Sequence, residues 1–188
     1  MKDDAQLIDE ALAGSSAAFG QLVTRYQDRL YNTLVHVVGS RDAAYDAVQD
    51  AFVQAYVKLD TFRRASAFYT WLYRIAFNLA VSRRRREKST VSIEHVRDTL
   101  GHEVVDRGDA PGARMEQDER ACQVRAGLAK LSEEHRAILV LREVDDCSYE
   151  QIAEILDLPI GTIRSRLHRA RLQLREQLKG ILQQEDVT

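Results

Sequence analysis

Apolar residues recur three and four positions apart along almost the whole chain, and this helical spacing limits the fold more than any other feature. Leucine, isoleucine, valine and aromatic residues follow it in one segment after another, and no segment shows the every-second-residue alternation of a half-buried strand. Only two prolines and nine glycines interrupt the 188 residues, too few for the many tight turns of a sandwich or barrel. We therefore predict an all-α fold.

Short breaks in the pattern divide the first half of the chain into four expected helices. They cover about residues 5–12, 18–38, 42–59 and 65–86. Gly14-Ser15-Ser16 separates the first two, and Gly39-Ser40 ends the second. Asp42 is the expected N-cap of the third, because an aspartate there can accept a hydrogen bond from the first turn.

The second half begins with a break in the periodicity and then returns to helices. Residues 89–114 carry glycine, proline and acidic residues, which predicts a flexible linker. Ser132 and Ser148 are expected N-caps, and Gln151 follows Ser148 in capping-box spacing. Asp157-Leu158-Pro159 forms a short turn before a last helix. We predict two small helical domains, at residues 1–88 and 115–180, with a tail at 181–188.

Positive charge is concentrated in two islands of an otherwise acidic chain. The formal net charge is -2, yet residues 62–88 hold eight basic groups and one acidic group, and residues 161–179 hold six and one. Clustered cations at two separate places suit a phosphate backbone. Two solvated helix faces are the alternative interpretation.

The second island is the segment GTIRSRLHRARLQLR, which has five arginines and one histidine. On a helical wheel Ile163, Leu167 and Ala170 share the core face. A helix of eight residues and a short turn precede it, which predicts a helix-turn-helix whose second helix enters the major groove. A solvated amphipathic helix is the alternative. The candidate DNA-binding residues of this helix are Thr162, Arg164, Ser165, Arg166, His168, Arg169 and Arg171, of which Arg166 and Arg171 point toward phosphates.

The first island contains FYTWLYRIAF at residues 68–77, with five of the thirteen aromatic residues, and arginines at 83–86. Tyr69, Trp71 and Tyr73 cannot all share one helix face. Aromatic rings beside cations suit unpaired bases, which stack on the rings while the backbone follows the charge. An aromatic core with a basic end is an equally good interpretation of this segment alone.

No pattern of a catalytic or metal site occurs in the sequence, and its five histidines are scattered. We therefore expect no enzyme activity, metal or cofactor. Cys122 and Cys147 lack CxxC or Cys-His spacing, so we expect reduced thiols, with a disulfide or zinc site as the alternative. No run of eighteen apolar residues and no apolar signal core occur, which predicts a cytoplasmic protein without membrane insertion.

The chain resembles bacterial sigma factors of the extracytoplasmic-function (ECF) type, the compact sigma-70 members with only regions 2 and 4. Three stretches carry this resemblance in order and spacing: DAVQDAF at 46–52, FRRASAFYTWLYRIAFN at 62–78 and SYEQIAEILDLPIGTIRSRLHRAR at 148–171. The resemblance implies an alternative sigma factor that binds core RNA polymerase and directs promoter-specific initiation through −35 and −10 recognition. Region 2 would be the first domain and region 4 the second.

The resemblance also implies a role for each part. The polymerase contacts would be the β′ clamp helices and the β flap, and an anti-sigma factor is a further expected partner. The residues expected to dock on the clamp helices are Asp46, Gln49, Asp50 and Phe52. A flipped −10 base would lie near Phe62, Arg63, Ser66 and Asn78. The other −10 candidates, from the aromatic helix, are Tyr69, Trp71, Tyr73, Arg83 and Arg84. The linker would be threaded through the RNA exit channel.

Two departures from the family pattern concern these sites. Ala43 and Tyr45 stand where acidic residues are frequent, and Arg64-Ala65 replaces a common glycine-acidic pair in the −10 loop. We expect core docking and −10 specificity to differ in detail. The main rival is a helix-turn-helix regulator that binds duplex DNA as a dimer without core polymerase. A second rival, an enzyme or an RNA-binding accessory, predicts a catalytic cluster that the sequence lacks.

Overall fold

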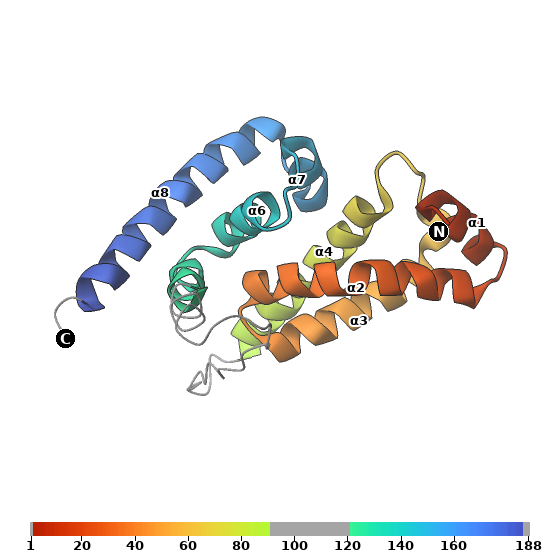
Figure 1. The fold of residues 1–188 in the computed structure, drawn as a ribbon, viewed down its shortest axis with the longest axis horizontal. Helices are drawn as coiled ribbons and strands as arrows, with labels where there is room; N and C mark the ends of the chain where they lie inside the picture. The colour runs from red at the N-terminus through yellow and green to blue at the C-terminus, as the bar shows by residue number, and fades with distance from the viewer. Residues whose placement is uncertain (1, 91–120, 186–188) are drawn as a thin grey trace, which may run out of the picture.

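The computed structural model describes residues 2–90 and 121–185, and within these ranges it is helical without a strand (Figure 1). The all-α prediction is confirmed. The described elements are α1 (Asp4–Leu12), α2 (Ser16–Val38), α3 (Arg41–Val57), the 3-10 turn η1 (Leu59–Thr61), α4 (Phe68–Thr90), a helical stretch at 121–129, α6 (Glu133–Glu143), α7 (Tyr149–Leu156) and α8 (Ile160–Glu185). Residues 91–114 of the predicted linker lie outside the described residues, whereas 89 and 90 belong to α4.

The helix boundaries follow from capping side chains at most of the expected places. The Ser148 hydroxyl accepts a hydrogen bond from the Gln151 amide at 3.2 Å, and the Gln151 side chain accepts one from the Ser148 amide at 2.7 Å. Ser132 caps α6 as predicted. The prediction for α3 was wrong by two residues, because Ser40 is the N-cap and Asp42 lies in the first turn, where its charge favours the helix dipole.

Helices α1 to α4 form an N-terminal unit in which α1 packs on α2. The buried face of α3 is built largely from small residues. Four alanines on that face are buried: Ala44, Ala47, Ala51 and Ala55. Small side chains let neighbouring backbones approach closely, and α2 and α4 both pack against α3. Within residues 2–90 and 121–185 the core takes only one side of α3, so the opposite side of the helix is largely exposed.

Residues 121–185 form a C-terminal unit in which α6, α7 and α8 enclose Ile138, Ile152 and Ile163. Gly127 lies against the second half of α8, where a Cβ atom would come within 3.1 Å of Leu174 Cδ1. The stretch 121–129 consequently crosses α8 closely. No helix in residues 2–90 or 121–185 has the length and apolar content needed to span a bilayer.

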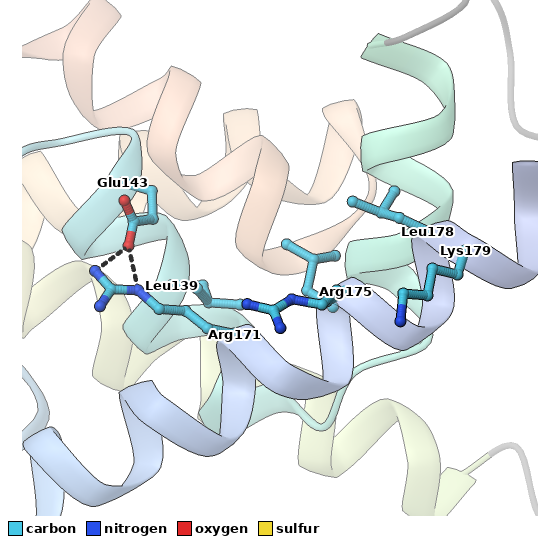
Figure 2. Close-up of a pocket in the computed structure, with 7 residues that line it drawn as sticks. Leu139, Glu143, Arg171, Arg175, Leu178 and Lys179 are labelled. Atoms are coloured by element: carbon cyan, nitrogen blue, oxygen red, sulfur yellow. Dashed lines mark hydrogen bonds and ion pairs between the residues drawn. The ribbon is translucent and has the colours of Figure 1, made fainter.

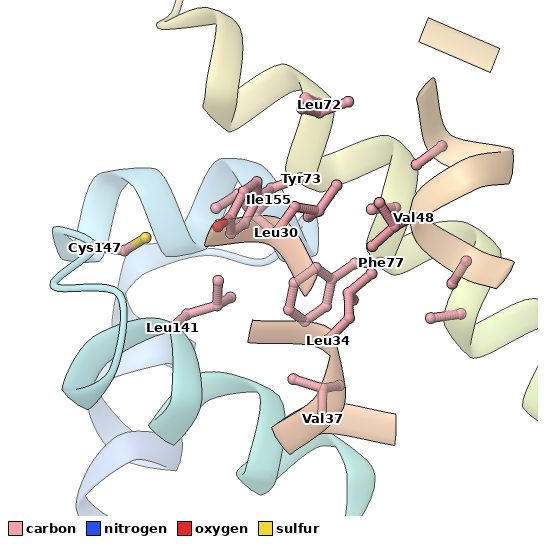
Figure 3. Packing of buried hydrophobic residues seen from close by; sticks show 14 of the residues in the cluster. Leu30, Leu34, Val37, Val48, Leu72, Tyr73, Phe77, Leu141, Cys147 and Ile155 are labelled. Atoms are coloured by element: carbon pink, nitrogen blue, oxygen red, sulfur yellow. The ribbon is translucent and has the colours of Figure 1, made fainter. Parts of the chain in front are cut away.

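The two units pack directly on each other, with α6 against α2 and α7 against α4. Figure 3 shows Tyr73 and Phe77 of α4 in one cluster with Leu141 of α6 and Ile155 of α7. The apolar core is thus continuous across both units. The sequence predicted two domains, and their contact is a finding of the structure.

Candidate DNA and polymerase interfaces

Helix α7, a three-residue turn and helix α8 form the predicted helix-turn-helix. Asp157 ends α7 in a left-handed conformation with φ 55°, which turns the chain sharply toward α8. Ile163, Leu167 and Ala170 are buried, as the helical wheel predicted. Four candidate residues on the opposite face are exposed: Arg164, Ser165, His168 and Arg169. A fifth, Thr162, is half-buried.

Arg166 and Arg171 hold α8 on α6 through glutamates instead of standing free for phosphates. Arg166 lies 2.7 Å from a carboxylate oxygen of Glu134. Arg171 donates from Nε and a terminal nitrogen to Glu143, at 2.9 and 2.6 Å (Figure 2). That hydrogen bond raises the pKa of Arg171. Both arginines already have an anionic partner within the chain, which the wheel did not reveal.

Tyr149, the first residue of α7, was not among the candidates, although it lies between two arginines. The guanidinium carbons of Arg142 and Arg164 are 5.5 and 5.9 Å from its ring centroid. Cation–π attraction at this distance orients each guanidinium. Tyr149 therefore helps to position Arg164 at the exposed face of α8. The sequence signal was the aromatic residue directly after the Ser148 cap.

The loop between η1 and α4 is fixed at one end by an aromatic cluster. Phe62 packs against Phe68 and Trp71, with ring centroids 5.7 and 5.1 Å apart. Arg63 is exposed and Ser66 half-buried, so both remain accessible beside this cluster. The contact of Phe62 with Trp71 places an aromatic surface at the end of this loop. The capture of a flipped base by Phe62, Arg63, Ser66 and Asn78 stays a prediction.

Tyr69 and Tyr73 occupy different environments on α4. Tyr69 is half-buried, and the Arg29 guanidinium lies 4.9 Å from its ring centroid. Tyr73 is 0 % exposed, and its hydroxyl is 3.3 Å from that of Thr33. Tyr73 cannot stack on a base in this conformation, because α2 and the C-terminal unit enclose its ring. Asn78 is exposed.

The side chains of Arg83 and Arg84 lie outside the described part of the structure, although both residues fall within α4. Their contribution to DNA binding stays a prediction from the sequence. The exposed Asn78 precedes both arginines on α4. The arginines therefore follow the accessible −10 candidates along the same helix.

The outer face of α3 contains three of the four residues predicted to dock on polymerase. Gln49 and Asp50 are exposed and Asp46 is half-buried. The side chain of Phe52, the fourth residue, is only 7 % exposed and belongs to the core, and its docking role stays a prediction from the resemblance. Its spacing of four from Val48 and three from Ala55, both buried, was the sequence signal for this burial.

Apolar residues that sequence reasoning missed complete this outer face. Val53 and Val57 are 64 % and 72 % exposed, and Tyr45 and Tyr56 are also exposed. Large apolar side chains gathered on one exposed face mark a protein interaction surface. We call Tyr45, Gln49, Val53 and Val57, with their neighbours on this side of the helix, the α3 outer face.

Metal and thiol chemistry add little to these surfaces. Among residues 2–90 and 121–185, no group of three or more histidine, cysteine, aspartate or glutamate side chains could hold a metal ion. Cys122 and Cys147 are free thiols, the first half-buried and the second buried. What the arrangement offers is recognition: one basic helix suited to duplex DNA and one aromatic loop suited to an extruded base.

Comparison with known proteins identifies the family to which a chain with these surfaces belongs. Residues 22–90 match the family model for sigma-70 region 2, and residues 123–174 match that for sigma-70 region 4. The chain belongs to the sigma-70 family. Region 2 of a sigma factor thus lies in the N-terminal unit and region 4 in the C-terminal unit, where it includes α7 and the first half of α8.

Relatives of known name assign the ECF group within this family. The chain is 38% identical to the RNA polymerase sigma-H factor of Pseudomonas aeruginosa over 97% of each chain. It is 40% identical to the ECF sigma-E factor of Escherichia coli K12, over 89% of this chain and 90% of the relative. The protein is an alternative sigma factor, which directs core RNA polymerase to promoters.

Solved structures share the same arrangement of helices. The sigma factor RpoE of Bartonella quintana, in complex with the anti-sigma factor NepR, matches with a TM-score of 0.72 at 28% identity, covering 86% of this chain and 96% of that one. CnrH, in complex with the cytosolic domain of CnrY, matches with a TM-score of 0.66 at 28% identity, covering 94% and 97%.

Proposed function

We propose that α8 reads the −35 element in the major groove through Arg164, Ser165, His168 and Arg169. Their common exposure on one face of the second helix of a helix-turn-helix is the observation that carries this proposal. Arginine can pair bidentately with guanine, and serine and histidine can reach other base edges. Thr162 lies at the start of this face. Arg166 and Arg171 would contact phosphates only by sharing or leaving their glutamate partners.

The −10 element is captured as unpaired DNA by the loop after η1 and by α4. Phe62, Arg63, Ser66 and Asn78 surround the flipped base, and Trp71 and Tyr69 offer ring surfaces to neighbouring bases. The basic end of α4, including Arg83 and Arg84, follows the phosphates. The cluster of Phe62 with Trp71 supports this assignment, because it pre-forms an aromatic surface beside exposed polar groups.

The α3 outer face docks on the β′ clamp helices of core polymerase. Asp46, Gln49 and Asp50 supply polar contacts, and the exposed Val53 takes the central place that the buried Phe52 cannot fill. An apolar centre with a polar rim is the usual composition of a protein interface. Region 4 contacts the β flap, and the linker follows the RNA exit channel.

The protein acts in the cytoplasm, has no catalytic activity of its own and leaves nucleotide addition to the polymerase. An anti-sigma factor is its expected regulator. The solved complexes of RpoE with the anti-sigma factor NepR and of CnrH with part of CnrY support this partner class. Free sigma factor binds promoter duplex weakly, because its net charge of -2 opposes the phosphate backbone outside the basic islands.

Run-off transcription with bacterial core polymerase on fragmented genomic DNA from the source organism tests this function. We expect new 5′ ends whose upstream sequences share two motifs. One motif should lie about one helical turn before the transcription start, and the other about three helical turns before it. Val53→Glu should abolish core binding and these starts, with an unchanged melting temperature. Leu172→Ala, which removes an exposed side chain from α8, is the matched control. No new starts, with dimeric binding to a palindrome, would favour the duplex-binding regulator.

A further inference from the structure

Helix α1 lies before the part of the chain that matches region 2, yet it binds the loop to which −10 recognition is assigned. The match begins at residue 22, whereas α1 ends at Leu12. The loop covers residues 62–67, between η1 and α4. Both terminal nitrogens of Arg64, in this loop, donate to the carboxylate of Asp9 on α1. A paired contact of this kind fixes the orientation of both groups.

The backbone that carries Asp9 is well anchored. Asp3 and Gln6 form a capping box at the start of α1, with hydrogen bonds of 2.8 and 3.2 Å. Leu7 and Ile8 are 0 % and 2 % exposed, so α1 is also held by its apolar face. Asp9 follows Ile8 directly. Its carboxylate is therefore presented to the loop from a helix that is fixed at its start and along its buried side.

A second chain of contacts connects α1 to the two ends of the loop. Asp4 of α1 accepts a hydrogen bond from the hydroxyl of Tyr26 on α2. The ring of Tyr26 lies 5.7 Å from that of Phe68, the first residue of α4. Phe68 packs in turn against Phe62, where the loop begins. The helix that binds the middle of the loop thus also helps to place its ends.

The backbone at Arg64 decides how its neighbours in the loop are oriented. Arg64 has a φ of 56°, in the left-handed region that is unfavourable for arginine. Arg63 precedes it and Ser66 follows two positions later, and both are −10 candidates. If residue 64 relaxed to a negative φ, the chain would change direction between these two side chains. The ion pair with Asp9 opposes that relaxation.

The exposure of this ion pair indicates a local role. The side chains of Arg64 and Asp9 are 44 % and 63 % exposed. Pairs between exposed charges contribute little to the stability of a whole protein. A weak interaction can still select one of two loop conformations when their free energies are similar. We therefore expect the pair to affect the loop much more than the fold.

We propose that Asp9 is a positioning residue for −10 recognition, and that its pair with Arg64 sets which base the loop accepts. The proposal rests on the −10 function proposed above. Asp9 acts through Arg64, which in turn orients Arg63 and Ser66. Glycine, which is common in the family at position 64, adopts a positive φ without such support. The arginine in this chain makes −10 recognition dependent on α1.

Exchanging the two charges tests the pair. Asp9→Arg and Arg64→Asp each remove it and place like charges opposite each other, whereas the double variant restores an opposite pair. Holoenzyme made with each variant transcribes a promoter library in which the −10 positions are randomised. An exposed pair changes an equilibrium by about two- to fivefold, so base discrimination at one −10 position should fall by about that factor in each single variant. The double variant should recover it.

Glu10→Arg is the matched control for Asp9→Arg. It makes the same change of charge at the next position of α1 and breaks an exposed pair with Lys2. We expect its base discrimination to equal that of the wild-type chain. The single variants and the control should melt within about 3 °C of the wild-type chain. An equal loss of discrimination in Glu10→Arg, or no recovery in the double variant, would overturn the proposal.

Amide hydrogen exchange in the free full-length chain measures the loop without transcription. Exchange of residues 63–67 should be faster in both single variants, unchanged in Glu10→Arg and slower again in the double variant, because a loop that loses its support opens more often. Unchanged exchange in both single variants would show that the pair does not hold the loop. That result would overturn the proposal even if the protein initiates transcription as proposed.

The two measurements together separate this proposal from the proposed function. Faster exchange with undiminished base discrimination would overturn the role of Asp9 and leave the −10 function intact. A wild-type holoenzyme without base preference at −10, in a chain whose exchange responds as expected, would contradict the −10 function itself. The role of Asp9 in recognition would fall with it.

Discussion

The guanidinium of Arg64 pairs with the carboxylate of Asp9, and it does so from a backbone conformation that arginine rarely adopts. Arg64 has a φ of 56°, and its side chain reaches from the loop between η1 and α4 to α1. Left-handed backbone is easy for glycine and unfavourable for other residues. The left-handed backbone at this position explains why the family often has glycine there. The ion pair with Asp9 shows that α1 supports the loop.

Exchanging Arg64 separates the backbone conformation from the ion pair. Arg64→Gly relieves the unfavourable φ and loses the pair, whereas Arg64→Ala loses the pair and keeps the unfavourable φ. We expect the glycine variant to melt roughly 2–4 °C above the alanine variant. Thermal unfolding followed by circular dichroism measures this difference. Equal melting temperatures would mean that the loop relaxes freely.

Asp9→Asn should broaden base preference at one −10 position in a promoter library and leave −35 preference unchanged.

Neutralising Glu143 should make Arg171 available to DNA. In Glu143→Gln the guanidinium loses its anionic partner, so we expect nonspecific duplex affinity to rise about two- to fivefold at low salt. The slope of log K against log salt should steepen by up to about 0.9, the value for one additional phosphate contact. Fluorescence anisotropy over a salt series measures both. Glu176→Gln, next to the exposed Lys179 on the same helix, is the control, and an identical gain there would show a general charge effect.

His36 should make the protein less stable in mild acid. Burial and the nearby charge of Arg125 lower the pKa of His36. Its Nδ1 has no hydrogen-bond partner among residues 2–90 and 121–185. Below about pH 6.5 the unfolded chain takes up a proton that the folded chain resists, so the free energy of unfolding falls as the pH falls. Urea unfolding at pH 5, 6 and 7 should show this decline reduced in His36→Gln. A parallel decline in the variant would assign the effect to other groups.

Cys147 should be a poorly reactive thiol in the folded chain, because it is buried. Burial and the neighbouring Asp145 raise the pKa of its thiol to about 11. Because the thiolate is the reactive form, labelling by a disulfide reagent at pH 8 should be about a hundredfold slower than in urea. Asp145→Asn should accelerate the labelling, because the charge of Asp145 contributes to the raised pKa of the thiol. Mass spectrometry distinguishes Cys147 from Cys122, and fast labelling of Cys147 in the native wild-type chain would contradict its burial.

Local features of the fold could be predicted because their causes are local. Ser148 and Gln151 form a capping box within four residues, and the buried face of α8 follows from periodicity alone. The N-cap of α3 was misplaced because Ser40 and Asp42 are both good capping residues, and only the backbone conformation decides between them. The buried position of Phe52 could have been read from its spacing, had the family resemblance not outweighed it.

Features that depend on long-range contacts could not be predicted from the sequence. Asp145 and Arg29 are 116 positions apart, and neither belongs to a motif that indicates the other. The burial of Tyr73 follows from that same packing. The pairing of Arg171 with Glu143 depends on how α8 lies on α6, which the wheel of a single helix does not contain.

Arg136 contacts both regions with one side chain. Its guanidinium donates to the carbonyls of Leu128, Ala129 and Leu131 within region 4, and to that of Val37 at the end of α2. Three of these bonds hold the turn between the helical stretch at 121–129 and α6. A substitution at this one position would therefore disturb a turn inside region 4 and the contact of region 4 with α2 at the same time.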